Sequence, residues 1–374
     1  MQWGAAPKKK TWSERVCDQP HQLFFVSALL WAIVTMGATF FSLIGKPIDF
    51  ALFHGFGLFH GVFSSAFLGF LFTVVPKYTN GLPVAQSRYM TTWVVLQAGL
   101  VAALFIAPVA GKVLVSAALL LAAATFFQTI AGGKFIYKHE SKWLAVSVTL
   151  GAASVWIDTM AAFWLYLVPV VFVVAQRMIP AFYAAWFNRP AWEKPVWFIA
   201  PFMVAFWTIA IGYLLGAPLL IAAGSFAGFV AVGYFLYSLD VWKKAPAIFW
   251  ILPLGIVWLE AGLGLLFIES IGGVYTGKLA FHAAAVGTLL TLLVGFGTRV
   301  ILGHSGQKIE ADRLAVGIFL LAQAVIAVRL IASAFQTAGS PMMTGFLHLS
   351  AWLWILLFIL WGARHYKTLL RVKQ

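Results

Sequence analysis

Apolar runs long enough to cross a lipid bilayer recur along almost the whole chain. A helix needs roughly 20 apolar residues to span the hydrocarbon core. The chain has twelve such runs between loop signals, at 22–44, 51–75, 91–107, 109–131, 143–157, 161–186, 197–215, 218–239, 247–268, 279–302, 312–335 and 344–366. With 62% apolar and only 10% charged residues, it cannot form a soluble surface. The sequence therefore predicts an all-α integral membrane protein of about twelve transmembrane helices.

The distribution of positive charge predicts the orientation of these helices. If the N-terminus, the even-numbered loops and the C-terminus are cytoplasmic, all but four of the 25 lysines and arginines lie on the cytoplasmic side. The exceptions are Lys46, Lys112 and Lys278 outside and Arg329 within a span. The net charge of +14 is thus explained by topology, and we do not expect nucleic-acid binding.

The chain divides into a cytoplasmic N-terminal tail at 1–20, a single polytopic domain at 21–367 and a short cytoplasmic tail at 368–374. The first residues lack the pattern of a cleaved signal peptide, so we expect the first helix to be retained. Cys17 is the only cysteine, which excludes an internal disulfide, a c-type heme attachment motif and a thiolate metal cluster.

Three of the eight histidines lie at a similar depth within spans. His54, His282 and His348 each sit about one turn inside the outer end of an inward-running helix, whereas His60 is rotated by roughly 120° from His54. The other four, at 21, 139, 304 and 365, lie near cytoplasmic helix ends, where we expect solvated side chains. A lone imidazole in a span most often donates a hydrogen bond across a helix contact. For His54 and His282 together, we favour metal or heme ligation instead.

A charged partner lies in the same layer of the membrane. Arg329 is placed in the outer half of the eleventh helix. Its guanidinium could bind a buried anion such as a heme propionate in a bidentate way. Equally, it could form an ion pair with Glu260 or Glu269 on the ninth helix. We predict that His54, His282, Arg329 and His348 bind a b-type heme, and that metal ligands come from His54, His282, His60 and His348, with copper as a further candidate metal.

A faint internal repeat relates the second, sixth and tenth helices. Their cytoplasmic ends read Thr73-Val-Val-Pro76, Gln176-Arg-Met-Ile-Pro180 and Thr298-Arg-Val-Ile-Leu302. Counting back from these ends leads to His54, Thr159 and His282. This pattern predicts three four-helix units around a pseudo-threefold axis.

Several segments resemble the motif pattern of NnrS-family membrane proteins. They are HQLFFVSALLWA at 21–32, His54 with GFLFTVVPKYTNG at 69–81, QRMIPAFY at 176–183, and FHAAAVGTLLTLLVGFGTRVILGHSG at 281–306, which is the most specific. The resemblance implies a heme- and copper-associated protein of the bacterial cytoplasmic membrane, linked to denitrification and to resistance against nitric oxide. By position, His54 and His282 match the intramembrane histidines of the family. The cytoplasmic-side motifs are matched by Arg177, Pro180, Arg299, Gly303, His304 and Gly306.

The chain departs from the family at one motif, W-H-x-H-E. It reads Phe53-His54-Gly55-Phe56-Gly57, so the second histidine and the glutamate are missing. A copper site built on them is therefore in doubt, and His60 lies on another helix face. A more distant resemblance, to the catalytic subunit of heme-copper oxidases, implies that His54 and His282 ligate a low-spin heme whose propionates meet Arg329. Positions 161–215 contain no histidine, so oxygen reduction at a heme-copper pair is not expected.

The leading hypothesis is a membrane hemoprotein that handles or responds to nitric oxide, by electron transfer, by binding, or by protecting iron centres. A rival hypothesis is a transporter of a metal or a small anion without heme, which buried charges and proline breaks such as Pro169, Pro180 and Pro253 would suit. A purely structural membrane subunit would leave the outer histidine layer unexplained.

Overall fold

The computed structural model describes residues 11–134, 138–190, 192–240, 243–274 and 276–371, and every regular element in these ranges is a helix. Eleven helical segments are long and apolar enough to cross a membrane. A twelfth segment, α6 (Lys138–Ser154), has 17 residues and corresponds to the shortest predicted span. The prediction of an all-α multipass membrane protein is confirmed.

The transmembrane helices follow one another as three units of four. The first unit comprises α2 (Pro20–Leu43), η1 with α3 (Ala51–Ser64, Ser65–Thr79), α4 (Gln86–Phe105) and α5 (Pro108–Gly132). The second comprises α6, then α7, η2 and α8 (Thr159–Ala162, Phe163–Leu167, Val168–Trp186), η3 with α9 (Val196–Ile199, Ala200–Leu215) and α10 (Pro218–Leu239). The third comprises α11 (Ala247–Gly272), then α12, η4 and α13 (Leu279–His282, Ala283–Leu290, Thr291–His304), α14 (Arg313–Thr337) and α15 (Met342–Leu369).

The units form a closed ring around a central core. In each unit the third and fourth helices pack together, as α4 with α5, α9 with α10, and α14 with α15. Helix α5 contacts α6, α10 contacts α11, and α15 returns to α2, which closes the ring. The second segment of each unit is the most enclosed, with 83%, 83% and 72% of its apolar window buried, against 56% or less elsewhere. This arrangement agrees with the predicted pseudo-threefold organisation.

Matching side-chain networks relate the first and third units at atomic level. Trp31 on α2 donates to Gln97 on α4 at 2.7 Å, and the Gln97 amide reaches Ser65 at 3.5 Å. In the third unit, Trp258 donates to Gln323 at 2.8 Å, and Gln323 donates to a hydroxyl on α13 at 3.1 Å. Both networks clamp the first, second and third helices of a unit together, with almost the same sequence spacings.

A π-helical stretch occurs in the outer half of all three central segments. These stretches are η1, η2 and η4, and each continues directly into an α-helix toward the other side of the bundle. Wide π-turns are rare and are often found at functional sites. Because the three stretches lie at the same depth, the centre of the bundle at that level is a candidate for a functional site.

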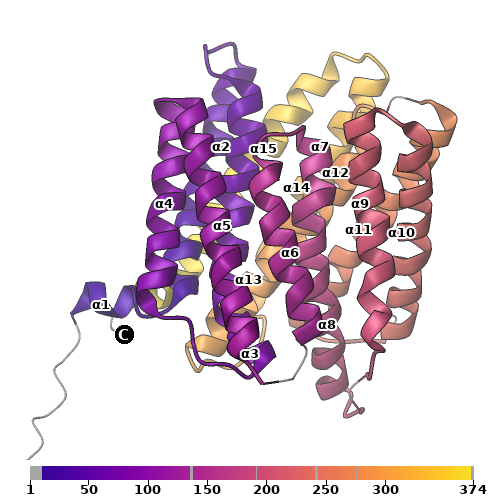
Figure 1. Cartoon of the computed structure of the whole chain (residues 1–374). Coiled ribbons are helices and arrows are strands. Elements are labelled where there is room, and N and C mark those ends of the chain that lie inside the picture. The colour runs from indigo at the N-terminus through magenta and orange to yellow at the C-terminus, as the bar shows by residue number, and fades with distance from the viewer. Residues whose placement is uncertain (1–10, 135–137, 191, 241–242, 275, 372–374) are drawn as a thin grey trace, which may run out of the picture.

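Both described chain ends lie on the same side of the bundle (Figure 1). The short helix α1 (Trp12–Val16) is held there because the Trp12 indole donates to the Leu370 carbonyl at 2.7 Å. An even number of crossings requires this common side. Its assignment to the cytoplasm remains a prediction from the basic residues.

Candidate functional site

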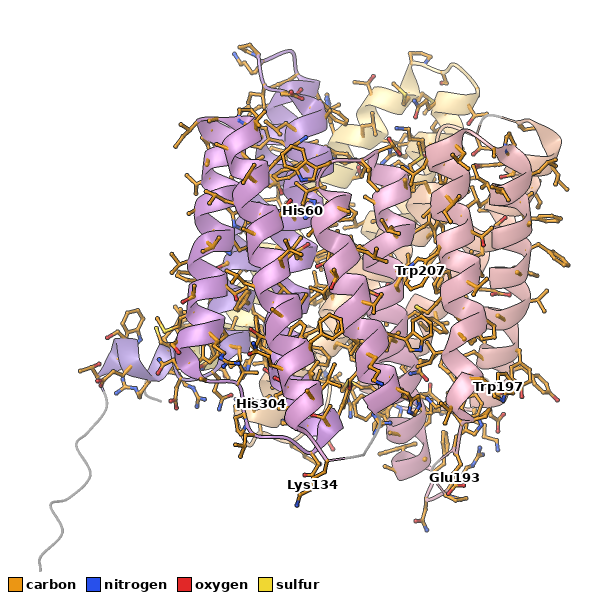
Figure 2. All side chains as sticks on the ribbon, in the orientation of Figure 1. His60, Lys134, Glu193, Trp197, Trp207 and His304 are labelled. Atoms are coloured by element: carbon orange, nitrogen blue, oxygen red, sulfur yellow. The ribbon has the colours of Figure 1, made fainter. Side chains whose placement is uncertain are left out.

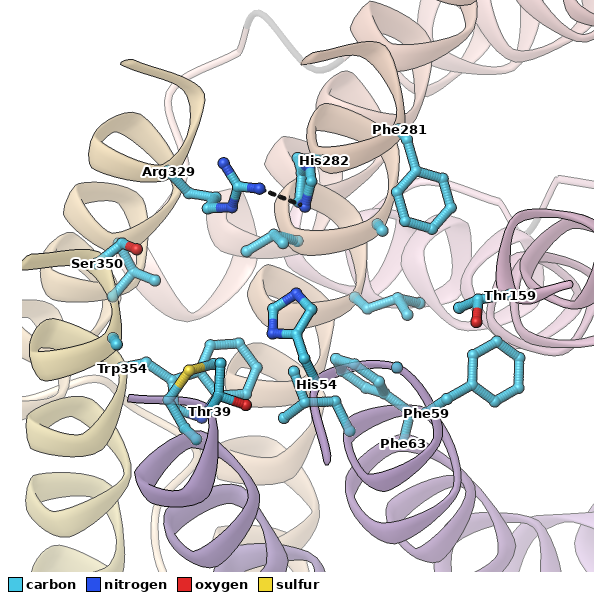
Figure 3. A pocket seen from close by; sticks show the side chains of 18 of the residues that line it. Thr39, His54, Phe59, Phe63, Thr159, Phe281, His282, Arg329, Ser350 and Trp354 are labelled. Atoms are coloured by element: carbon cyan, nitrogen blue, oxygen red, sulfur yellow. Dashed lines mark hydrogen bonds between the residues drawn. The ribbon is translucent and has the colours of Figure 1, made fainter. Parts of the chain in front are cut away.

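An internal cavity lies on the side opposite the described chain ends, at the level of the π-helical stretches. Its cavity volume is about 140 Å³, close to the ~150 Å³ of dry apolar cavities that take up benzene or xenon. Most of its lining is apolar and comes from all three units, including Phe59, Phe163 and Trp354. Among the described residues that line it, only His54, His282 and Arg329 are ionisable, and Figure 3 shows them around one open space.

His282 is held in one orientation and one tautomer. Its Nδ1 lies 2.8 Å from the carbonyl of Lys278, to which only an N–H can donate. Nε2 therefore carries the free electron pair and accepts a hydrogen bond from Arg329 Nη2 at 2.9 Å. A backbone carbonyl on one imidazole nitrogen and a free pair on the other is the usual arrangement of a metal-binding histidine.

His54 faces His282 from the η1 segment (Figure 3). Its ring stacks on Phe50, with centroids 4.8 Å apart and an interplanar angle of 20°. Its Nδ1 is buried and has no hydrogen-bond partner among the described residues. A buried polar atom without a partner costs about 1–3 kcal/mol, so this position favours a bound ligand. The structure thus brings together the two histidines that the sequence singled out.

Arg329 on α14 belongs to the same cavity. Its Nη1 donates to Ser333 at 3.0 Å, while Nη2 reaches His282. The two glutamates that the sequence offered as alternative ion-pair partners of Arg329 are engaged elsewhere or lie apart from it. Glu269 accepts hydrogen bonds from Thr276 and from the N–H of Ala280, and Glu260 lies beside the backbone of α10 at Gly233. The guanidinium is thus positioned to meet an anionic group in the cavity.

His348 and His60 lie apart from this pair. His348 on α15 is not among the residues that line the cavity, and its ring packs against Phe40 with centroids 5.4 Å apart. His60 is 2% exposed and lines a separate, more polar cavity of about 250 Å³ together with Asp49 and Lys112. Figure 2 shows His60 in the outer half of the bundle, far from His304. The expectation that His60 occupies a different helix face from His54 agrees with the structure.

The structure gives a steric reason why the glutamate of the family motif is missing after His54. A Cβ atom on Gly57 would lie 2.8 Å from Cγ2 of Thr35, so no larger side chain fits there without movement of α2. Phe56 lines the His60 cavity, where its ring lies 5.9 Å from the ammonium of Lys112. The second histidine position of the family motif would therefore point into the His60 cavity.

The expectation of solvated histidines at the helix ends was wrong for two of them. His21 and His365 are each only 3% exposed. The His21 ring packs against that of His304, with centroids 4.5 Å apart, so the first and last of the quoted family segments meet at this end of the bundle. Proximity to a helix end could not reveal this burial, because it depends on neighbouring helix ends and on the segment that carries α1.

A buried charge cluster on the same side contains one of the motif positions, Arg177. Glu140 on α6 lies 3.2 Å from Arg177 and 3.8 Å from Lys194. Burial lowers the pKa of Lys194 to about 8, although Glu140 opposes the shift.

Arg299 is 9% exposed and lies over the rings of Phe182 and Phe249, as a cation–π contact requires. Arg177 and Arg299 thus contact neighbouring helices at the ends of the central helices, and neither lines the His54–His282 cavity.

Comparison with known proteins gives one family. The family model described as NnrS protein matches residues 15–373. A search of curated proteins found no match. The matched range includes all twelve transmembrane segments and the His54–His282 cavity, and the chain therefore belongs to the NnrS family.

Proposed function

We propose that this protein is a hemoprotein of the bacterial cytoplasmic membrane that takes part in the handling of nitric oxide or in the response to it. The observation that carries the proposal is the pair of imidazoles, His54 and His282, which face one another across an apolar cavity. Imidazole from two helices of a bundle is a common axial ligation of b-type heme.

The residues present fit such a group. The aromatic lining of the cavity suits an apolar ring system, and a heme would require the side chains around its volume of about 140 Å³ to move apart. Arg329 supplies one cation where the carboxylates of a heme would need neutralisation. The unpartnered Nδ1 of His54 gains from a ligand, and Nε2 of His282 carries an electron pair that could pass from the Arg329 guanidinium to a metal.

The chain has distinct tasks in this arrangement. The carbonyl of Lys278 holds the proton on Nδ1 of His282, so Nε2 carries the electron pair, and an iron bound there would replace the hydrogen bond from Arg329. Arg329 balances negative charge beside that ring, and residues such as Phe59 and Trp354 exclude water. A bound heme would supply one-electron chemistry and an iron that binds nitric oxide. Ligation by both histidines would leave no open iron position, which favours electron transfer over direct catalysis.

Copper has weaker support. His60 and His348 each offer an imidazole, but they lie in separate surroundings. Among the described residues no group of three or more histidine, cysteine, aspartate or glutamate side chains is placed to hold a metal ion. The proposal therefore rests on heme alone.

The test is an optical spectrum of the detergent-purified protein, oxidised and dithionite-reduced, with and without nitric oxide. We expect a sharp reduced α-band in the wild type that disappears in His54→Ala and in His282→Ala. His348→Ala is the matched control and should keep the band. Nitric oxide should change the wild-type spectrum or oxidise the reduced form. A wild type without heme, purified after growth with excess heme, would refute the proposal and favour a transporter of a metal or a small anion.

A further inference from the structure

A second cavity lies below the first along the axis of the bundle. This axial cavity has a volume of about 40 Å³ and is lined by residues of α3, α8 and α13, together with Phe25 of α2. Every residue of its lining is apolar. The three central helices thus leave space where they meet, although they are the most enclosed segments of the protein.

A single layer of side chains separates the axial cavity from the His54–His282 cavity. Phe63, Leu167 and Leu289 line the upper cavity. The residues four positions further along each helix, Phe67, Val171 and Leu293, line the axial one. Four residues correspond to about one helical turn, or roughly 6 Å. The rings of Phe63 and Phe67 lie 6.3 Å apart and form part of the partition.

A third cavity continues sideways from the axial one. It shares four lining residues with it, namely Phe25, Ala66, Leu293 and Gly297. It then extends to Leu29 on α2 and Phe358 on α15, at the seam where the third unit meets the first. We call it the seam cavity.

The outer end of the seam cavity lies close to the lipid-facing surface. Leu29 is half-buried, and its neighbour Leu30 is 58% exposed on that surface. Leu29 packs so closely on Gly362 of α15 that a Cβ there would lie 2.7 Å from its Cδ2. The Leu29 side chain therefore lies between this end of the cavity and the lipid-facing surface.

We propose that the axial and seam cavities bind small apolar molecules and lead them from the lipid at the α2–α15 seam to the His54–His282 cavity. Dry cavities lined by leucine and phenylalanine take up apolar ligands such as xenon. An apolar diatomic gas is more concentrated in lipid than in water. An entrance that opens to the lipid therefore receives more of the gas than one that opens to the aqueous side. The identity of the natural ligand, nitric oxide, rests on the proposed function; the binding of apolar molecules does not.

Xenon tests the cavities independently of heme. Crystals of the full-length protein are pressurised with xenon, and anomalous scattering locates the bound atoms. We expect xenon in the axial and seam cavities of the wild type. Ala66, which lines both, is changed to leucine to fill them. Ala118→Leu is the control, because this buried alanine of α5 lines neither cavity. No xenon in the wild type, or equal occupancy in Ala66→Leu, would overturn the proposal.

The route is tested by kinetics with heme-loaded protein in lipid nanodiscs. The rate at which nitric oxide changes the reduced spectrum should fall several-fold in Ala66→Leu and stay unchanged in Ala118→Leu, at equal heme content. An unchanged rate in Ala66→Leu would refute the route. A wild type that binds xenon but no heme would refute the proposed function and leave the apolar binding sites standing.

Discussion

The contact between Gly57 and Thr35 allows a sharp test of how the histidine-bearing helices are packed. In the first unit, Gly57 on η1 meets Thr35 on α2. In the third unit the glycine is on the other helix of the pair. There Ala284 on η4, the segment equivalent to η1, meets Gly262 on α11, the helix equivalent to α2. Gly57→Ala should therefore destabilise the protein, and Thr35→Gly should relieve the clash by giving the first unit the arrangement of the third.

The magnitude follows from the geometry. The new Cβ would lie 2.8 Å from Thr35 Cγ2, and overpacking of this kind costs about 1–3 kcal/mol. The greater helix propensity of alanine returns up to about 1 kcal/mol. We expect a net loss of about 1 kcal/mol in Gly57→Ala. Thr35→Gly should also destabilise, since it removes a fully buried side chain and its hydrogen bond to the Trp31 carbonyl. The two losses should not add, with a favourable coupling of about 1–3 kcal/mol.

The assay is reversible unfolding by SDS in mixed micelles of the wild type, both single variants and the double variant. Gly55→Ala is the matched control on the same helix, because its Cβ would meet only Thr159 Oγ1, at an ordinary 3.4 Å. It should be neutral or slightly stabilising. Additivity of the two single changes within about 0.5 kcal/mol would refute the steric explanation. It would also remove the physical reason given for the missing glutamate at position 57.

Three further predictions concern charge and hydrogen bonding. The folded-state pKa of Lys194 is about 8 against an ordinary 10.5, so the unfolded chain binds more protons in this window; thermal stability in detergent should rise from pH 8 to 10.5 in the wild type but not in Lys194→Met. Gln97→Leu and Gln323→Leu each leave an indole N–H without its partner and should cost a similar amount, about 1–3 kcal/mol in denaturant titrations; clearly unequal costs would contradict the equivalence of the two networks. In Arg329→Gln the midpoint potential of bound heme should fall in a redox titration, because a cation beside His282 favours the reduced iron; an unchanged potential would place the heme elsewhere.

Hydropathy was sufficient to predict the helical architecture, because lipid constrains a chain so strongly. Each predicted span corresponds to one helical segment, with boundaries shifted by a few residues. The depth of a residue follows from counting along a span. This is why the sequence could place His54, His282 and Arg329 in one layer, and the structure finds them around one cavity.

Depth alone does not fix the direction in which a side chain points. His348 lies at a similar depth to His282, but the face of α15 that lines the cavity carries Leu347, Ala351 and Trp354. These positions follow the helical spacing of four and then three residues, and His348 is one residue, about 100°, away from the first of them. The sequence holds this periodicity, yet it does not say which face of an all-round apolar helix meets the axis.

The π-helical stretches could not be predicted from the sequence either. No residue pattern in Ala51–Ser64 or Ala283–Leu290 distinguishes them from α-helix, since the wide turns arise where three helices meet around a space. A π-turn rotates the residues that follow it relative to a regular helix. Estimates of facing based on 3.6 residues per turn, such as that for His60 against His54, therefore carry an error that only the structure removes.

The pseudo-threefold arrangement is broken at the cavity in a way that bears on its use. The first and third units supply a histidine each, whereas the second supplies Thr159 and a wall of apolar residues such as Phe163. The same two units carry the Trp–Gln networks, whose hydroxyl ends, Ser65 and Thr291, begin the α-helices that follow η1 and η4. Three equivalent histidines would converge on one small ion. Two that face one another, beside a third side that is apolar, instead suit the flat group that we propose to lie between them.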